Sequence, residues 1–382
     1  MTFGWLKRLW RLFLRQDWIA VLTAVALLGI GLAFIYSASW RGEDTGIVGA
    51  WFHKQIVWAS LGGALALTLA LVDYHFWTRH AWLLFLVSVV LLVLVLVAGR
   101  KVYGAYRWLV LFGVPVQPSE FAKVALVILV AHVLGNPALP PHSLGLMLVV
   151  LLLAAVPFML ILVEPDLGTA LVLGPTIFFM LFAAGMRWRY FFSAAVAALA
   201  AAPLGWYFIL GDYQKERILT FLDPSRDPLN SGWNALQAAI AVGSGGIHGK
   251  GFLNGTQNVL GFLPRTVSPS DFIFPVIAEE TGFVGACILL GLFALLLATY
   301  VRAALVAPDP AGSLLATGLA GLLFSHVFVN IGMTIGLLPI TGLPLPLVSS
   351  GGSFMLSTLA AFGLVQSVFI RRARAPSPDT IG

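Results

Sequence analysis

The sequence predicts an all-α integral membrane protein with about ten transmembrane helices and a large extracytoplasmic loop between the seventh and the eighth. Of its 382 residues, 59% are hydrophobic and only 10% are charged, and the mean hydropathy is +0.95. A soluble chain of this size needs far more charge. The apolar runs are long enough to cross the bilayer core as helices and too long for barrel strands.

The predicted spans follow from the apolar runs in chain order. The first is interpreted as a retained helix and not as a cleavable signal, because its basic, aromatic lead is long and the run itself can span. The fourth is short and carries charged residues. An even number of spans places both termini on one side. The ranges are 18–37, 55–72, 80–98, 119–134, 144–163, 168–185, 189–210, 275–301, 312–337 and 351–370.

The distribution of Lys and Arg predicts the side on which each loop lies. With the N-terminus inside, eleven of these residues fall in inner segments and ten in outer segments. Five of the outer ten lie in the long segment 211–274, and long segments count little in the positive-inside rule. The remaining comparison, eleven against five, predicts cytoplasmic N- and C-termini.

The chain is predicted to form a single membrane domain over residues 1–382. Its large extracytoplasmic loop, 211–274, has balanced charge and is too long to be a simple connector. Within this loop, "SGWNALQAAIAVG" predicts an amphipathic helix at the membrane interface. The tail, 371–382, begins with basic residues and is predicted to be cytoplasmic. Cys287 is the only cysteine, which excludes an internal disulfide and a cysteine-based metal site.

Charged residues inside or beside apolar spans are costly and therefore mark candidate functional sites. In "VPVQPSEFAKVALVILV", Pro118 and Ser119 predict a helix start with Ser119 as its cap. Glu120 and Lys123 then share one face of the first turn. Two interpretations stay open: a local ion pair beside a helix cap, or a polar face on a cavity where Lys123 meets an anion.

Two neighbouring stretches carry further polar residues. The outer segment "YGAYRWL" adds Arg107, a cation, and Trp108, for which an aromatic anchor at the membrane interface is the alternative. The run "ILVEPDLGTALVLGP" joins two spans. In it, Pro165 and Gly168 predict a tight turn, and Asp166 is predicted to cap the next helix.

The densest group of acids lies in "SPSDFIFPVIAEETGFVG". Pro275 suits the first turn of a helix, which places Asp271 just ahead of that helix at its outer mouth. Glu279 and Glu280 lie about one turn further in. Like charges and partial burial raise carboxyl pKa values, the usual preparation for a general base. The alternative is that Asp271 only caps the helix and the glutamates pair with basic residues of neighbouring spans.

Prolines interrupt the apolar run "NIGMTIGLLPITGLPLPLVSSGGS" at Pro339, Pro344 and Pro346. Non-helical backbone at membrane depth is tolerated where it is buried in protein or lines a cavity. The run therefore predicts either a wall of a substrate cavity or a hairpin loop.

The glycine-rich stretch "AVGSGGIHGKGFLNGTQ", residues 241–257, only superficially matches a nucleotide-binding loop. A Walker loop requires Gly where this chain has Ser244, and Ser or Thr where it has Gly251. A Gly-x-Gly-x-x-Gly pattern from Gly249 fails at Asn254. Nucleotide binding is excluded. A backbone-amide site for another phosphate and a set of flexible turns both stay open.

Taken together, these stretches resemble the shape, elongation, division and sporulation (SEDS) family of polytopic enzymes in bacterial cell-wall synthesis. The resemblance covers nearly the whole chain, and "FLDPSRDP" and "GKGFLNGTQ" resemble its rod-shape branch more than its division branch. The family implies ten helical spans and a peptidoglycan glycosyltransferase that polymerises lipid II outside the cytoplasmic membrane. The other matching stretches are "RWL", "QPSEFAK", "EPDLGTALV", "SDFIFPVIAEETG" and "NIGMTIGLLPITGLPLPLVSSGGS".

The resemblance implies that Asp271, the aspartate of "DFIF", is the candidate catalytic base. It would deprotonate a sugar hydroxyl of the acceptor, with inversion at the donor sugar and undecaprenyl diphosphate as leaving group. Arg107 and Lys123 are expected at the diphosphate, and Glu120 is expected to orient Lys123 or the substrate. With the residues singled out above, the substrate-binding candidates are Arg107, Trp108, Gln117, Ser119, Glu120, Lys123, Lys250, Glu279, Glu280, Ser349 and Gly351.

The chain departs from the family pattern in two places. The segment "LPRTVSPSD", residues 263–271, is two residues longer than the usual Leu-Pro-Glu-x-His-Thr-Asp and lacks its Glu and His. Ser350 stands where the family commonly has tyrosine. The roles of those missing side chains therefore do not carry over to this chain.

The implied partners are lipid II, the nascent glycan strand, a class B penicillin-binding protein and membrane proteins of the elongation complex, in the bacterial cytoplasmic membrane. A divalent cation, Mg²⁺ or Mn²⁺, is the one candidate cofactor, and no nucleic acid is expected. Three alternatives stay open: a lipid II flippase, a non-catalytic scaffold for a transpeptidase, and a division-type member of the family. The charged candidates gather at the outer ends of the spans, which favours an external enzyme over a flippase.

Overall fold

The fold is built mainly from helices, as predicted. The computed structural model describes residues 4–40, 45–102, 105–111, 113–140, 142–264 and 267–372. A helix lies over each predicted span. The long helices are α2 (Trp18–Ser39), α3 (Thr45–Leu71), α5 (Ala81–Ala98), α6 (Pro118–Leu134), α7 (Leu144–Val163), α8 (Leu167–Ala183), α9 (Trp188–Phe208), α13 (Ile273–Leu305), α14 (Pro310–Thr334) and α15 (Gly352–Ile370).

The remaining elements are short. They are the helices α1 (Gly4–Leu14), α4 (Tyr74–Arg79), α10 (Asp212–Leu222), η1 (Pro224–Arg226), α11 (Ser231–Ser244) and α12 (Thr256–Val259), and the strands β1 (Arg100–Val102), β2 (Ala105–Leu111) and β3 (Val114–Val116). The predicted amphipathic helix "SGWNALQAAIAVG" is confirmed as helical in α11. Most of the predicted tail, from residue 373 onward, lies outside the described residues, as do Arg265 and Thr266 of the departing segment.

Eight of the described helices are long and apolar enough to cross a membrane. They are α2, the Ala50–Leu71 part of α3, α5, α7, α9, α13, α14 and α15. The other two long helices, α6 and α8, have 17 residues each, and α6 carries two charged side chains. The protein is therefore a multi-pass membrane protein, while the count of ten spans stays a prediction.

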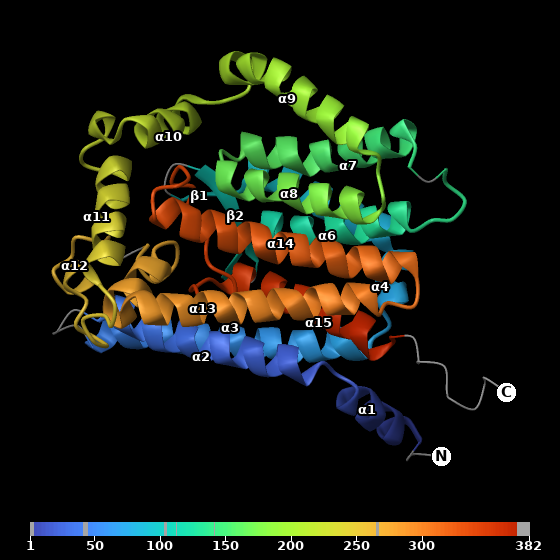
Figure 1. Ribbon diagram of the computed structural model, residues 1–382, viewed down its shortest axis with the longest axis horizontal. Helices are drawn as coiled ribbons and strands as arrows, with labels where there is room; N and C mark the ends of the chain where they lie inside the picture. The colour runs from blue at the N-terminus through green and yellow to red at the C-terminus, as the bar shows by residue number, and fades with distance from the viewer. Residues whose placement is uncertain are drawn as a thin grey trace.

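The most deeply buried helices are α6, α14 and α15, which form the centre of the bundle. Helix α15 packs against α3, and α14 packs against α6, α8 and α13. Helices α2, α5 and α7 lie further out and bury only part of their apolar side chains against this centre. Helix α9 has no buried residue and diverges from α7 and α8 (Figure 1). A centre of three buried helices leaves the apolar outer faces free to contact lipid.

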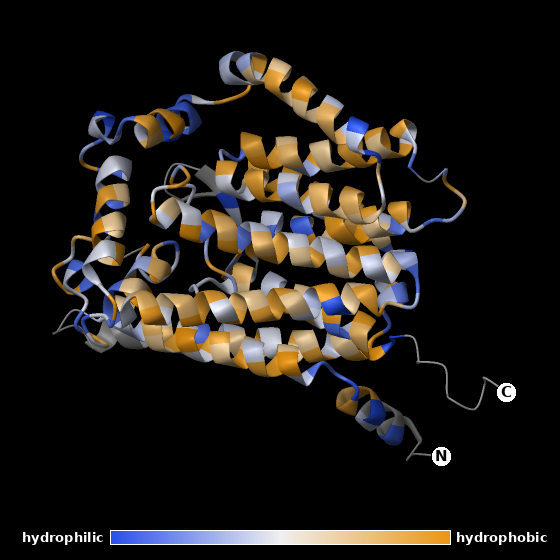
Figure 2. Cartoon of the chain, in the orientation of Figure 1, coloured by the Kyte–Doolittle hydropathy of each residue, from blue (hydrophilic) through white to orange (hydrophobic). Residues whose placement is uncertain are grey.

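The two ends of the bundle differ in structure. Both termini lie at one end, and α11, α12 and the start of α13 lie at the other (Figure 1). Hydrophobic residues run along the bundle helices, whereas hydrophilic residues gather in α10 and near α1 (Figure 2). The end that carries α11 and α12 is called the loop end below. It is the end predicted to be extracytoplasmic.

A small antiparallel sheet at the loop end was not predicted. Its strand order is β1-β2-β3, and Leu109 of β2 pairs with Val116 of β3. The apolar and aromatic residues of "AYRWLVL" favour a strand, but the stretch was predicted to be a loop between two spans. The sheet matters for function because it fixes Arg107 and Trp108. In a strand these neighbouring side chains point to opposite faces.

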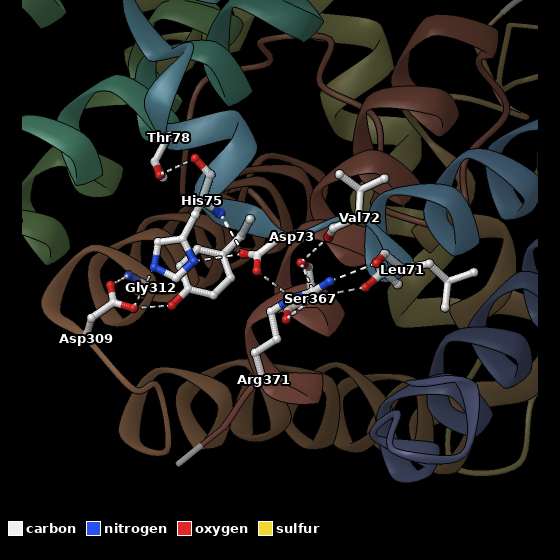
Figure 3. Close-up of polar contacts among 11 residues, drawn as sticks. Leu71, Val72, Asp73, His75, Thr78, Asp309, Gly312, Ser367 and Arg371 are labelled. Carbon is white, nitrogen blue, oxygen red and sulfur yellow. Dashed lines mark hydrogen bonds and ion pairs between the residues drawn. The ribbon is translucent and has the colours of Figure 1, made fainter. Parts of the chain in front are cut away.

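A polar cluster ties together the helix ends at the opposite end of the bundle (Figure 3). His75 lies between two carboxylates: its Nδ1 is 2.8 Å from Asp73 Oδ1, and its Nε2 is 3.2 Å from Asp309 Oδ2. Arg371 Nε is 3.1 Å from Asp73 Oδ2, and its guanidinium donates to the last carbonyls of α3. Asp73 and Asp309 also cap α4 and α14. The cluster therefore fastens α14 and α15 to α3 and α4.

Candidate functional site

Asp271 lies at the loop end, in the turn just ahead of α13, as predicted. Its side chain is partly buried. Asn330 of α14 donates from Nδ2 to the backbone oxygen of Asp271 at 3.0 Å and to that of Leu343 at 2.6 Å. One buried amide group therefore joins the Asp271 turn to α14 and to the non-helical segment that follows α14.

That non-helical segment, 336–351, forms a buried support for Asp271. Ser349 donates its hydroxyl proton to the backbone oxygen of Ser270 and accepts a bond of 2.8 Å from Leu345 N. At Gly342, where φ is +73°, an added Cβ would lie 3.2 Å from Asp271 Oδ2. Glycine is favoured there on both counts, conformation and space. The run broken by prolines thus forms a buried wall beside Asp271, and its predicted role as a wall of a substrate cavity stays a prediction.

Arg107 is held where α7 passes into α8. Its Nε donates to the backbone oxygen of Glu164 at 3.2 Å, and its Nη2 donates to that of Pro165. Asp166 Oδ2 lies 4.0 Å from Arg107 Nε and accepts a bond of 3.2 Å from Gln117 Nε2. Asp166 also caps α8, as predicted, by accepting from Thr169 N at 3.2 Å. The "RWL", "QPSE" and "EPD" motifs therefore meet in one polar group.

The environment of Asp271 raises the pKa of its carboxyl to about 6. Burial is the largest cause, and the negative charge of Asp166 adds to it. The Ser270 hydroxyl and the positive charges of Arg217 and Arg107 act in the opposite direction. A carboxyl with this pKa is ionised at neutral pH and remains basic enough to accept a proton. These groups are near enough to Asp271 to act on its charge, and we call them together the Asp271 site.

Glu164 is a buried acid beside this site that the sequence analysis left without a role. Its side chain is 0% exposed, and neither carboxyl oxygen has a hydrogen-bond partner among the described residues. Burial and the negative charge of Asp166 raise its pKa, the positive charge of Arg107 lowers it, and together they give a pKa of about 8. The carboxyl is therefore largely protonated at neutral pH.

Glu164→Gln is expected to change how stability depends on pH. An unfolded Glu loses its proton near pH 4.5, and the folded one loses it near pH 8, so the free energy of unfolding falls as pH rises between these values. Glutamine does not titrate. The variant should gain stability relative to the parent, on the order of 4 kcal/mol by pH 8.

Thermal unfolding in detergent at pH 5 and pH 8 measures this gain. Glu216→Gln is the matched control, because Glu216 is half exposed and makes only a 4.0 Å contact with Arg226. Its effect should stay below about 1 kcal/mol at both values of pH. A pH-independent difference between Glu164→Gln and the parent would contradict a protonated Glu164.

Lys123 and Glu120 form a buried ion pair inside the bundle. Lys123 Nζ is 3.0 Å from Glu120 Oε1 and 2.8 Å from His326 Nε2, and the two charged side chains are 1% and 3% exposed. Ser357 donates to Glu120 Oε2 at 3.3 Å. Of the open interpretation of a capped helix with a local ion pair near the interface, only the ion pair is confirmed, and it lies buried in the bundle. The predicted contact of Lys123 with a diphosphate stays a prediction.

Ser119 does not cap α6. The helix begins at Pro118 with Gln117 as the preceding residue, so Ser119 is the second helical residue, and its hydroxyl is buried without a partner among the described residues. The prediction of a Ser119 cap is wrong because Pro118 takes the first helical position, where its fixed φ is favoured and no N–H is needed. Gln117 N is bonded to Ser353 Oγ at 3.0 Å.

The glycine-rich loop, 245–258, is hydrogen-bonded to α13 at the point where that helix is interrupted. At Gly282 φ is +68° and the helix is interrupted. The backbone N–H groups of Lys250 and Gly251 donate to the oxygens of Glu279 and Glu280, each at 3.0 Å. Beyond the break, the N–H groups of two further α13 residues donate to loop oxygens in return. The loop thus satisfies backbone groups that an unbroken helix would have paired internally.

The two glutamates anchor the same loop with their side chains. Glu279 Oε1 is 2.6 Å from Lys250 Nζ and accepts a bond of 3.0 Å from Thr256 Oγ1. Glu280 accepts from Leu253 N at 3.1 Å and from the hydroxyl of Ser37 in α2. The predicted alternative, in which both glutamates pair with basic residues of neighbouring spans, is wrong in detail: the base beside Glu279 belongs to this loop, and Glu280 accepts from a backbone N–H and a hydroxyl. The structure places Lys250, Glu279 and Glu280 in this anchor, and substrate contacts by them stay a prediction.

Ser349 and Gly351, two further predicted residues, belong to the segment that follows α14 and are held there by Gln55. Gln55 of α3 donates to the backbone oxygen of Ser349 at 3.1 Å and accepts from Gly351 N at 3.2 Å. Ser349 is fully buried. Trp108 lies next to Arg107 on β2 and is partly exposed. Gln55 was not predicted as a site residue, because it follows His53 and Lys54 at the start of a span and matches no functional motif.

The described part of the chain holds no group of three or more His, Cys, Asp or Glu that could bind a metal ion. Mg²⁺ is often held by one or two carboxylates together with substrate phosphates. Asp166 and Asp271 are the acids at the site that suit this arrangement. Away from the site, an apolar groove of about 790 Å³ lies between α7, α8 and α9, and its lining includes Leu151, Phe178 and Phe192.

The chain resembles known proteins along nearly its full length. A peptidoglycan glycosyltransferase MrdB of Escherichia coli K12 is 40% identical over 352 residues, which cover 92% of this chain and 93% of that protein. A probable peptidoglycan glycosyltransferase FtsW of Geobacter metallireducens is 38% identical over 373 residues, which cover 95% of this chain and 96% of that protein.

Solved structures agree with this likeness. A chain of a peptidoglycan synthase complex that coordinates polymerization and crosslinking matches with a TM-score of 0.79 and 34% identity, over 94% of this chain and 99% of that one. Thermus thermophilus rod shape determining protein RodA matches with a TM-score of 0.70 and 32% identity, over 94% of this chain and 98% of that one. The family model FTSW_RODA_SPOVE, described as cell cycle protein, matches residues 18–373, and the chain belongs to this family.

Proposed function

We propose that this protein is a peptidoglycan glycosyltransferase of the rod-shape branch, which polymerises lipid II into glycan strands on the outer face of the bacterial cytoplasmic membrane. The observation that carries the proposal is the Asp271 carboxyl. It lies at the loop end with a pKa of about 6, supported by a buried wall and flanked by arginines. The names of the relatives, MrdB, RodA and FtsW peptidoglycan glycosyltransferases, support the same reaction class.

In the proposed reaction Asp271 accepts the proton of an acceptor sugar hydroxyl. The hydroxyl oxygen then forms a bond to the anomeric carbon of the donor sugar, with inversion, while the bond from that carbon to the diphosphate breaks. The leaving diphosphate gains negative charge, and nearby cations stabilise it. Arg107 is suited to this task because its guanidinium is fixed by two backbone oxygens at the end of α7.

The proposal extends to location and partners. With the loop end outside, the polar cluster of His75, Asp73 and Arg371 lies at the cytoplasmic face with both termini. A class B penicillin-binding protein would add the transpeptidase activity, in line with the matching chain from a synthase complex. Membrane proteins of the elongation complex would be further partners. A divalent cation would be held by Asp166 or Asp271 together with substrate phosphates.

Purified protein mixed with lipid II in liposomes tests the function, alone and with a class B penicillin-binding protein. We expect glycan strands of increasing length, resolved by gel electrophoresis. A flippase would move labelled lipid II between leaflets without forming strands. A scaffold would form none in either mixture. Either of these last results would overturn the proposal.

The division branch stays an alternative, because the 38% identity to the FtsW relative is close to the 40% identity to MrdB. Expression in cells depleted of their own rod-shape or division member of the family separates the two branches. Restored elongation supports the proposal, and restored division supports the alternative.

A further inference from the structure

Three arginines lie close together at the end of the bundle opposite the loop end. They are Arg15, just ahead of α2, Arg302, near the end of α13, and Arg372, just after α15. The guanidinium carbons of Arg302 and Arg372 lie 5.0 Å and 4.3 Å from the ring centre of Phe369. Arg372 also donates from Nη1 to the backbone oxygen of Arg15 at 2.9 Å. The proposed reaction uses none of these three residues, which we call the arginine cluster.

The arginine cluster carries more positive charge than nearby acids balance. Asp17, which is buried, is the one acid of the described residues that forms an ion pair with a member of the cluster, Arg302. Burial, the charge of Arg15 and the charge of Arg302 lower the pKa of Arg372, and the charge of Asp17 raises it. Like charges held this close repel each other unless an anion offsets them. The cluster therefore favours a negatively charged ligand.

Two exposed tryptophans mark the depth of the cluster in the membrane. Trp10 of α1 stacks on Phe13, and Phe13 meets Trp18 of α2 edge to face, with ring centres 5.7 Å and 5.1 Å apart. Tryptophan gathers at the membrane interface, at the level of the lipid headgroups. Arg15 stands between these two tryptophans in the chain. The cluster therefore lies at the depth of the lipid phosphates.

Apolar side chains extend from the cluster along the two neighbouring helices. Ile19 and Leu22 lie at the start of α2, Val301 and Leu305 lie at the end of α13, and all four are exposed. Each pair shares one helix face, and α2 packs against α13. A soluble anion would leave these side chains uncovered, whereas the acyl chains of a phospholipid would cover them.

We propose that the arginine cluster binds the phosphate of an anionic phospholipid, whose acyl chains lie on the exposed faces of α2 and α13. Arginine suits this ligand because its planar guanidinium donates parallel hydrogen bonds to phosphate oxygens. Nη1 of Arg372 is fixed by the backbone oxygens of Arg15 and Phe369, at 2.9 Å and 3.0 Å, which holds its other donors in place. Basic groups between spans at a membrane surface bind anionic headgroups in this way. The inference does not depend on the proposed function, since no catalytic group takes part.

A bound phosphate would stabilise the contact of three helix ends. Asp17 N donates to Gln366 Oε1 at 2.9 Å, and Gln366 Nε2 donates to the backbone oxygen of Asp17 at 3.4 Å. These bonds join α2 to α15, and the ion pair of Asp17 with Arg302 joins them to α13. The like charges of the arginine cluster act against this contact, and an anion offsets their repulsion. Anionic lipid should therefore raise the thermal stability of the protein.

Native mass spectrometry of the full-length protein in neutral detergent tests the site. Phosphatidylglycerol should bind at least about tenfold more tightly than phosphatidylcholine with the same acyl chains, because only the first has a net negative charge. It should also raise the midpoint of thermal unfolding, which phosphatidylcholine should not. Inorganic phosphate at the same concentration should not displace it. Displacement would indicate a site for free phosphate, and either this result or equal binding of the two lipids would overturn the inference.

Two double variants locate the site. Arg15→Gln with Arg372→Gln removes two of the three charges and should weaken phosphatidylglycerol binding by about 30-fold. Arg187→Gln with Arg189→Gln is the matched control, because it makes the same change of charge where α8 passes into α9, at the same end of the bundle (Figure 1). The control should keep the preference for phosphatidylglycerol. Equal losses in both double variants would mean that any arginine at this end serves, and would overturn the inference.

The single variant Arg15→Gln covers the case in which the double variant does not fold. Among the described residues the Arg15 side chain makes no hydrogen bond or ion pair, so the fold should not depend on it. This variant should bind phosphatidylglycerol about fivefold more weakly than the parent. Arg372→Lys should retain part of the binding, because it keeps the charge and loses the planar donors. Parent-like binding by Arg15→Gln would contradict the assignment.

Discussion

Asp271→Asn is expected to abolish lipid II polymerisation, with a loss of about 10³-fold or more. Asparagine has nearly the same shape but cannot accept the proton of the acceptor hydroxyl. The fold should persist, because Asn330 binds the backbone oxygen of residue 271 and not its side chain. The rate at which the purified variant polymerises lipid II into glycan strands measures the effect. Retained polymerisation would show that Asp271 is not the base.

A matched control and a pH profile complete this experiment. Asp212→Asn changes an exposed acid of the same loop, 211–274, and should leave activity unchanged. In the parent protein, activity should be high above pH 6 and fall as pH drops through about 6, since the base acts only when deprotonated and its pKa is about 6. A profile without this fall would contradict the assignment independently of any substitution.

Lys123→Met is expected to destabilise the fold by about 3–5 kcal/mol. It leaves the Glu120 carboxylate buried at 3% exposure, with Ser357 at 3.3 Å as its one remaining donor among the described residues. A buried charge without its partner costs far more than the pair contributes. The midpoint of thermal unfolding in detergent measures the loss.

The double variant Lys123→Met, Glu120→Gln should regain most of this stability, because it removes both charges from the bundle centre. A double variant as unstable as the single one would mean that the ion pair is not the cause. Polymerisation by the stable double variant then separates two roles. If polymerisation returns together with stability, the pair acts by holding α6. A stable but inactive protein means that Lys123 or Glu120 also contacts substrate.

Local patterns predicted the features that depend on neighbouring residues in the chain. Apolar runs predicted the positions of the long helices, and Asp166 was predicted as a cap because a cap is set by its own turn. The position of Asp271 ahead of α13 followed from the proline two residues into that helix. Ser119 was assigned wrongly because Pro118 competes for the same turn, a conflict that local rules do not settle.

Contacts between distant segments could not be predicted in this way. The wall behind Asp271 comes from residues more than sixty positions later, Ser349 among them. Arg217 was not predicted as a functional residue, because its loop carries as many acids as bases. Its effect on the charge of Asp271 depends on how the loop folds. Lys250 was considered for phosphate binding, yet its partner is Glu279, 29 positions along the chain. The burial of Glu164 likewise depends on packing that no local pattern encodes.

The break at Gly282 determines how motion could reach the catalytic base. An unbroken helix acts as a lever, since its internal hydrogen bonds carry a tilt from one end to the other. In α13 that chain of bonds stops nine residues into the helix, and the bonds across the gap run through the glycine-rich loop. A tilt of the longer, spanning part therefore reaches Asp271 through this loop. The loop therefore connects the two parts of α13, and the Lys250–Glu279 ion pair fastens it to the shorter part.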